Sequence, residues 1–211
     1  MKYSKEFKEA ITNLPSKEKD KLILRLLKKD LLLANRLFFE LLSNDSVEEK
    51  RDKLEIKLLT KINQGPDDEH HSVSYLKWDV REFSGLINEH VSITKDKFGE
   101  AYLNLVMINA VLSKYKNLII IDGPPAKKRK FCVAVIARVF KILLIIHKLD
   151  KDLYIEFEDG LQTLGNLIIN NKYLMQEAIR NGLDINWLLN IDIPENIIEI
   201  HKEIRTNGFL K

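Results

Sequence analysis

Residues 123–149 read GPPAKKRKFCVAVIARVFKILLIIHKL, and this stretch decides how the rest of the chain is interpreted. Gly123 and the two prolines after it interrupt any preceding element, but proline is tolerated in the first turn of a helix, so a helix can begin at about Pro125. Apolar residues then recur on most sides of that helix as far as Leu149. The stretch therefore predicts a long, mostly buried helix at the centre of the protein.

The same segment carries the strongest charge asymmetry of the chain. Residues 123–151 contain eight basic residues and one acidic residue, whereas residues 63–122 and 152–211 carry net charges of −3 and −5. At about 100° per residue, most of the basic side chains fall on one narrow stripe of the helix. Cations at a helix N-terminus oppose the helix dipole, and a nearby anion relieves that conflict. The candidate residues for binding an anion or a partner are Lys127, Lys128, Arg129, Lys130, Arg138, Lys141 and Lys148.

Two interpretations of the cationic helix remain open. In the first, its cations and the free N–H groups after Pro125 hold a phosphate, a nucleic-acid backbone or an acidic protein segment. In the second, the stripe is a solvated face of a structural helix. Its cations would then pair with acids such as Asp152, Glu156, Glu158 and Asp159.

Outside this segment the sequence pattern is also helical. Eight glycines and five prolines in 211 residues are too few for a protein with many β-hairpins. Ser46 and Glu49 have the spacing of a capping box, and apolar residues recur at helical spacing after each start signal. The expected helices cover residues 4–12, 16–29, 31–42, 46–62, 74–90, 94–115, 125–149, 152–170, 172–181 and 194–207. Residues 118–121 are expected to be a buried extended stretch or a helix end.

The chain is therefore predicted to be all-α, an array of about nine or ten antiparallel helices. Short connections suit either a HEAT-like α-solenoid or a closed helical bundle, and no repeat of fixed period is evident. With 45% hydrophobic residues, residues 1–211 are expected to form a single helical domain. Residues 63–73, NQGPDDEHHSV, are the place where a subdomain boundary would fall.

The number of cysteines and the lengths of the apolar segments indicate where in the cell the protein is located. The single cysteine, Cys132, cannot form an intramolecular disulfide, and the first residues lack the apolar core of a secretory signal. The longest apolar stretch, residues 131–146, contains Arg138 and Lys141, which argue against a membrane-spanning helix. We therefore expect a cytoplasmic protein without a transmembrane segment, with Cys132 as a buried structural thiol.

Five potential metal ligands stand in a row at residues 67–71, DDEHH. Imidazole and carboxylate groups suit zinc or manganese, so an uncharacterised metal-dependent enzyme that uses His70 and His71 is one alternative. Adjacent ligands do not have the helical or turn spacing of most metal sites, and no Walker loop, dinucleotide-binding glycine motif or nucleophile elbow is present. We therefore expect no catalytic residue, no metal site and no cofactor.

The function that these features favour is a non-catalytic cytoplasmic scaffold or adaptor, which binds a protein partner of acidic character through the cationic helix. The alternative is a nucleic-acid-binding protein that contacts phosphates through Lys127–Lys130 and through Arg138, Lys141 and Lys148. Trp78 and Trp187 are expected to be core or interface anchors.

Overall fold

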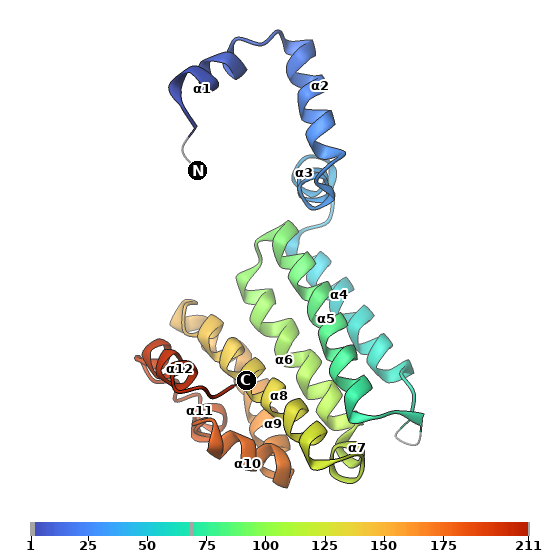
Figure 1. Cartoon of the computed structure of the whole chain (residues 1–211), viewed down its shortest axis with the longest axis vertical. Helices are drawn as coiled ribbons and strands as arrows, with labels where there is room; N and C mark the ends of the chain where they lie inside the picture. The colour runs from blue at the N-terminus through green and yellow to red at the C-terminus, as the bar shows by residue number, and fades with distance from the viewer. Residues whose placement is uncertain (1–2, 68–69, 211) are drawn as a thin grey trace. The chain divides into compact units, whose positions relative to one another are not determined.

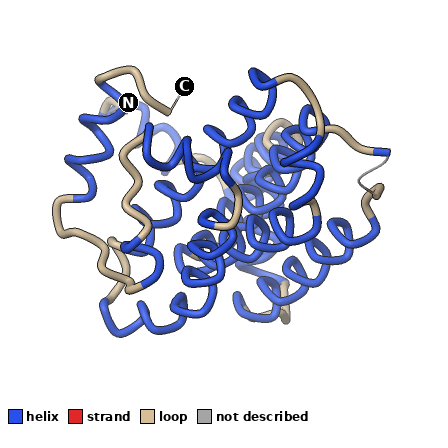
Figure 2. Tube along the Cα trace, turned by 90° about the horizontal axis from the view of Figure 1, so that it is seen from below, coloured by secondary structure: helices blue, strands red, loops and turns tan. Residues whose placement is uncertain are grey.

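The computed structural model of the chain describes residues 3–67 and 70–210. These residues form helices and connecting loops, with no strand among them (Figure 2), so the prediction of an all-α protein is confirmed. The helices are α1 (Lys5–Thr12), α2 (Ser16–Leu27), α3 (Leu31–Leu42), α4 (Val47–Gln64), α5 (Val73–Thr94), α6 (Lys97–Lys114), α7 (Lys116–Ile121), α8 (Pro125–Ile146), the 3-10 helix η2 (Lys151–Phe157), α9 (Glu158–Ile169), α10 (Lys172–Arg180), α11 (Asn186–Leu189) and α12 (Ile197–Thr206).

The chain divides into two compact units. The smaller unit comprises residues 1–44 and 92–94, and the larger unit comprises residues 45–91 and 95–211. Helices α1 to α3 belong to the smaller unit, and α4, most of α5 and α6 to α12 belong to the larger one. The segment of residues 63–73 joins α4 to α5 inside the larger unit. The single domain inferred from the sequence stays a prediction.

Helices α6 and α8 form the centre of the larger unit. Helix α6 packs against α4, α8 and α9, and α8 packs against α6, α10 and α12; the two central helices lie side by side in Figure 1. Pro125 occupies the first turn of α8, and Phe131, Ile136 and Phe140 are fully buried, as the apolar pattern predicts. None of the described helices combines the length and the apolar character needed to cross a membrane.

Local capping signals place several helix starts. The Ser46 Oγ accepts a hydrogen bond from the Glu49 N–H at 3.1 Å, and a Glu49 carboxylate oxygen accepts one from the Ser46 N–H at 2.7 Å. This is the predicted capping box, and it satisfies two N–H groups that the first turn of α4 leaves without helical partners. Asp30 caps α3 in a similar way by accepting from the Leu33 N–H.

The structure corrects the predicted start of α6. Thr94 is the last residue of α5 and does not open a new helix. Lys95 has a φ of 62°, a left-handed conformation that ends α5, and Asp96 then caps α6. The cap at Asp96 brings a carboxylate into the interior of the larger unit.

Other segments refine the expected secondary structure. Residues 116–121 form the short helix α7, so of the two alternatives for residues 118–121 the helix end fits and the extended stretch is wrong; Leu118 and Ile119 are buried against the core. Residues 151–157 form a 3-10 helix before α9 begins at Glu158, and α8 ends at Ile146, three residues before the predicted end.

Candidate functional site

The cations predicted on α8 do not form one free stripe. Lys128 is buried, and its Nζ donates a hydrogen bond to the Ile120 carbonyl oxygen at 2.5 Å. The same Nζ lies 4.7 Å from the centre of the Tyr173 ring, within the range of a cation–π contact. Lys128 therefore joins α7 and α10 to the start of α8.

Arg129 is engaged by an acidic residue of α10. Its Nε lies 3.4 Å from the Glu177 carboxylate, which is almost completely buried. An Arg180 N–H donates to the same carboxylate at 2.9 Å, and the Asn181 side-chain amide also contacts it. Glu177 therefore pairs with Arg129 of α8 and with Arg180 of its own helix.

Further along α8, two cations are held by α6. A guanidinium N–H of Arg138 donates to the Asn104 side-chain oxygen at 2.9 Å, and the Lys141 Nζ lies 2.9 Å from a Glu100 carboxylate oxygen. Burial raises the pKa of Glu100, but hydrogen bonds from Lys97 and Lys141 outweigh that effect and hold the pKa below its ordinary value. The acids that pair with α8 are thus Glu100 and Glu177, and not the four acids of residues 152–159.

Lys127, Lys130 and Lys148 are exposed and form no ion pair with any described residue. Lys127 and Lys130 lie in the first two turns of α8, whereas Lys148 lies in the turn after the helix ends. The predicted set of seven cations therefore separates into three exposed side chains without an ion pair to a described residue and four that contact protein groups, of which Arg129 is itself exposed.

A groove between α5 and α8 brings other cations together. We call it the α5–α8 groove; it has a volume of about 380 Å³. It is lined by Lys77, Trp78, Val80, Arg81, Phe131, Ala134, Val135 and Arg138. The sequence predicted Arg138 as a binding candidate and Trp78 as an anchor, but Lys77 and Arg81 were missed.

The lining of this groove combines positive charge with apolar surface. Among the described residues its lining includes three cations and no acid, and Phe131 and Val135 form a buried apolar floor. The two acidic side chains of α5 nearest to Lys77 and Arg81 in sequence already have partners: Asp79 lies 2.8 Å from His71, and Glu82 lies 2.9 Å from Lys61. The groove therefore presents positive charge beside apolar surface.

Trp78 stands at this groove with 70% of its surface exposed. Trp187 behaves differently, because it packs edge-on against the buried Phe140 ring at a centroid distance of 6.3 Å. Trp187 thus packs against the hydrophobic core, whereas Trp78 lies outside it. Trp78 is therefore available to contact a ligand at the groove, where tryptophan is a common interface anchor.

A second pocket, of about 510 Å³, lies between α8 and α10 and includes Arg129, Lys130, Glu177 and Arg180. Two of its cations, Arg129 and Arg180, contact the Glu177 carboxylate, so an incoming anion would have to compete with a buried acid of the protein. The α5–α8 groove, by contrast, has no acidic residue among the described residues of its lining.

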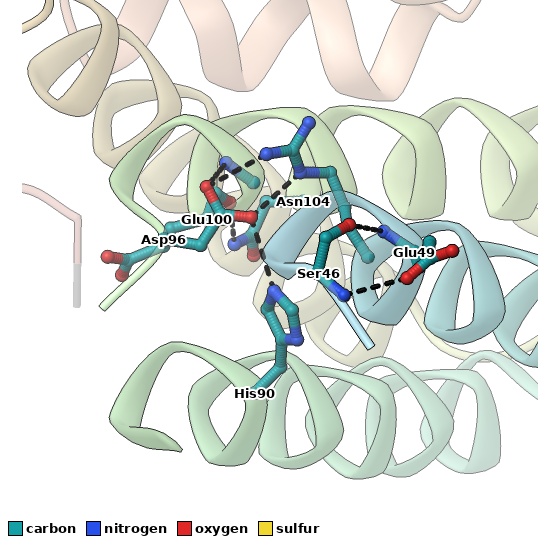
Figure 3. Close-up of polar contacts among 8 residues, drawn as sticks. Ser46, Glu49, His90, Asp96, Glu100 and Asn104 are labelled. Atoms are coloured by element: carbon teal, nitrogen blue, oxygen red, sulfur yellow. Dashed lines mark hydrogen bonds and ion pairs between the residues drawn. The ribbon is translucent and has the colours of Figure 1, made fainter. Parts of the chain in front are cut away.

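The polar cluster around Asp96 joins helices of the larger unit. Asp96 accepts a hydrogen bond from the Gly99 N–H at 2.7 Å and two from the Arg51 guanidinium, at 2.7 and 3.2 Å. The His90 Nε2 lies 3.3 Å from the same carboxylate, and Figure 3 shows His90 pointing to Asp96 from the neighbouring helix. Asp96 thus ties α4, α5 and α6 together.

The pKa of Asp96 reflects these contacts. Burial alone raises the pKa, but hydrogen bonds from His90, Arg51 and the Gly99 N–H, together with the Arg51 charge, lower it from 3.8 to about 2. The carboxylate is therefore ionised at neutral pH and fully engaged. It does not have the raised pKa of a general acid or the free position of a nucleophile.

Cys132 is fully buried, as expected from its apolar neighbours. Burial, helped by the nearby Glu177 carboxylate, raises the pKa of its thiol to about 12. The thiol is therefore protonated at physiological pH, which makes it a poor nucleophile.

We expect Cys132 to resist thiol reagents in the folded protein. A disulfide reagent added at pH 8 should modify it at least about a hundredfold more slowly than it modifies the urea-unfolded chain, because reaction needs both exposure and the thiolate. Absorbance of the released thiol follows both reactions. Equal rates in the two states would show that Cys132 is accessible.

The histidine-rich segment is only partly described, since Asp68 and Glu69 lie outside the described residues. His71 contacts Asp79 and lies over the Tyr115 ring at a centroid distance of 5.2 Å, so it belongs to the packing between α5 and α6. In the described part of the chain, no group of three or more His, Cys, Asp or Glu side chains is arranged to hold a metal. The metal-dependent enzyme stays a prediction.

Comparison of the chain with protein-family models, with curated proteins and with solved structures finds no significant match in any of the three. Any function must therefore be inferred from the helical fold and from the α5–α8 groove.

Proposed function

We propose that this protein is a non-catalytic helical adaptor that binds an acidic, amphipathic protein segment in the α5–α8 groove. The observation that carries the proposal is the lining of the groove, where three cations surround an apolar floor beside the exposed Trp78. A helix with acidic and apolar faces matches both features, since its apolar side would contact the floor and its carboxylates would reach the cations.

A nucleic acid is the alternative ligand, and Trp78 beside Lys77 and Arg81 suits it because bases stack on aromatic side chains. Nucleic-acid binding draws most of its affinity from many phosphate contacts, however. On α8, Lys128, Arg129, Arg138 and Lys141 are engaged with protein groups. This leaves Lys127, Lys130 and Lys148 with Lys77 and Arg81 of the groove for a phosphate backbone, and the apolar floor would stay unused.

We further propose that the larger unit is a closed helical bundle and not a HEAT-like solenoid. Helix α6 contacts helices both before and after it in the chain, including α9, and one continuous hydrophobic cluster extends from α4 to α12. A solenoid would instead limit each repeat to contacts with its neighbours. We also propose a cytoplasmic location, which suits a chain whose single cysteine is a buried, protonated thiol.

Binding of an acidic peptide tests the proposed function. The probe is a fluorescently labelled peptide of about 20 residues with leucine at helical spacing and glutamate elsewhere, and anisotropy gives its dissociation constant. Trp78→Ala should weaken binding roughly 30-fold, as expected for an interface hot spot. The double charge reversal Lys77→Glu plus Arg81→Glu should weaken it at least as much.

A matched charge reversal controls for net charge. Lys202 and Arg205 are exposed on α12, and Lys202→Glu plus Arg205→Glu makes the same change in charge outside the groove. This variant should bind the peptide within about twofold of the parent protein. Absence of peptide binding at low salt, or tighter binding of single-stranded DNA or RNA that is lost with the groove cations, would overturn the proposal in its stated form.

A further inference from the structure

Arg138 of the α5–α8 groove differs from two other cations of α8 in the kind of group that holds it. Lys141 and Arg129 each lie beside a carboxylate, at 2.9 and 3.4 Å, so a negative charge of the protein offsets each of them. Arg138 is held by a neutral group, because its guanidinium donates a hydrogen bond to the side-chain oxygen of Asn104 at 2.9 Å. It forms no ion pair with any described residue. Arg138 is therefore fixed in place and keeps its positive charge.

Asn104 is a fully buried polar residue of α6. Its side-chain amide donates to the backbone carbonyl of Glu100, one turn earlier in the same helix, at 2.6 Å, and its side-chain oxygen accepts from Arg138. Burying an amide costs free energy unless its hydrogen bonds are made. Among the described residues, Arg138 is the only group outside α6 that is hydrogen-bonded to Asn104. An asparagine at this position thus orients the guanidinium.

The guanidinium keeps most of its hydrogen-bonding capacity. Arginine carries five N–H donors in a rigid fork and stays protonated in proteins. Asn104 is the one described residue that accepts a hydrogen bond from Arg138, which is half-buried in the lining of the groove. Burial lowers the pKa of Arg138, and the charge of Glu100 opposes that effect, although Glu100 is itself paired with Lys97 and Lys141. Arg138 therefore offers the groove a positive charge and N–H groups without a described acceptor.

A single carboxylate matches this arrangement. We propose that Asn104 is a positioning residue that presents Arg138 as the receptor for one aspartate or glutamate side chain of the bound segment; this inference rests on the adaptor function proposed above. A guanidinium fork binds a carboxylate through two parallel hydrogen bonds.

The position of Arg138 on α8 also predicts a spacing in the partner. Arg138 follows Phe131 of the floor by seven residues, so the two lie on the same side of α8, about 10 Å apart along its axis. A partner helix that lies alongside α8 would meet them with an apolar residue and an acidic residue about seven positions apart.

The preference for glutamate over glutamine tests this role. Two labelled peptides of about 20 residues carry leucine at helical spacing and glutamine elsewhere, and one of them has a single central glutamate with a leucine seven positions away on either side. The parent protein should bind the glutamate peptide about tenfold more tightly, as expected for a hydrogen bond between charged groups, and anisotropy gives both dissociation constants. Arg138→Lys keeps the charge but lacks the fork, and it should lose most of this preference.

Asn104→Asp tests the positioning residue itself. The change keeps the size of the side chain but gives Arg138 a counter-ion within the protein. The two peptides should then bind with dissociation constants within about twofold of each other, whereas the glutamine peptide should bind within about threefold of its affinity for the parent protein. If Asn104 served the fold alone, the substitution would weaken both peptides equally and leave the preference unchanged.

Asn109→Asp is the matched control. Asn109 also lies on α6, and its side-chain amide also donates to a backbone carbonyl, that of Gly160, at 2.8 Å. Asn109→Asp therefore adds the same charge and removes the same kind of hydrogen bond, but it does so outside the lining of the groove. It should leave the preference for glutamate unchanged. Circular dichroism shows whether each variant is folded, and Arg138→Lys decides the outcome if Asn104→Asp does not fold.

Failure of this role and failure of the adaptor function give different results. A parent protein that binds no acidic peptide would overturn both. Peptide binding that is weakened by Trp78→Ala, but whose preference for glutamate survives in a folded Asn104→Asp or in Arg138→Lys, would overturn only the role of Asn104 and Arg138. Loss of the preference in these two variants, but not in Asn109→Asp, is the expected result.

Discussion

Asp96→Ala is expected to lower the free energy of unfolding by about 3–5 kcal/mol, because it leaves the Arg51 guanidinium without its partner in the interior. The substitution also removes the acceptor that caps the Gly99 N–H at the start of α6. Since small domains are stable by roughly 5–15 kcal/mol, the loss would be a large part of the total. Urea unfolding followed by circular dichroism measures it.

Asp150→Ala is the matched control for this experiment. Asp150 also accepts a backbone N–H at a helix start, from Asp152, but it is exposed and belongs to no described ion pair. Its loss should cost at most about 1 kcal/mol. A loss for Asp96→Ala no larger than that of the control would show that the buried ion pair adds little.

The lowered pKa of Asp96 also makes the stability of the folded protein depend on pH. The group has a pKa of about 2 in the folded protein and an ordinary value of 3.8, so its contribution to stability is present above pH 3.8 and is lost as the pH falls toward 2. Over this window the unfolded chain binds more protons than the folded one. Asp96→Asn should flatten the rise in stability across the same window.

Much of the fold could be predicted because its signals are local. Ser46 and Glu49, Asp30 and Pro125 each act within one helical turn, and all of them mark helix starts in the structure. Residues 118–121 were harder to interpret, since isoleucine-rich runs favour strands in isolation. In the structure these residues form helix α7, in which Leu118 and Ile119 are buried against the core.

The candidate site was less predictable because it depends on contacts between distant segments. The sequence identified α8 as cationic, but it could not show that Glu177 and Glu100 would pair with Arg129 and Lys141. The other wall of the groove comes from α5, where Lys77 and Arg81 are one helical turn apart beside Trp78. That spacing indicates a cationic face, but only the packing of α5 near α8 makes it part of a groove.

For Gly99→Ala, helix propensity predicts a gain in stability, whereas the structure predicts a loss. In an exposed helix, replacing glycine by alanine stabilises by about 0.5–1 kcal/mol. At position 99 the new Cβ would overlap the Asp96 carboxylate and lie 2.9 Å from the Arg51 Nε. Gly99→Ala should therefore destabilise the protein by about 1–3 kcal/mol, as overpacking does. Gly85 of α5 has no described atom within 4 Å of the corresponding position, so Gly85→Ala should stabilise.

A double-mutant cycle identifies the cause of the Gly99→Ala effect. In an Asp96→Ala background the overlapping carboxylate is absent, so the same Gly99→Ala change should become neutral or stabilising. Urea unfolding of the four proteins gives the interaction energy. If Gly99→Ala destabilises equally with and without Asp96, its effect does not arise from the Asp96 cluster. If Gly99→Ala costs stability only when Asp96 is present, α6 requires glycine at position 99 because the capping carboxylate occupies the space of a side chain.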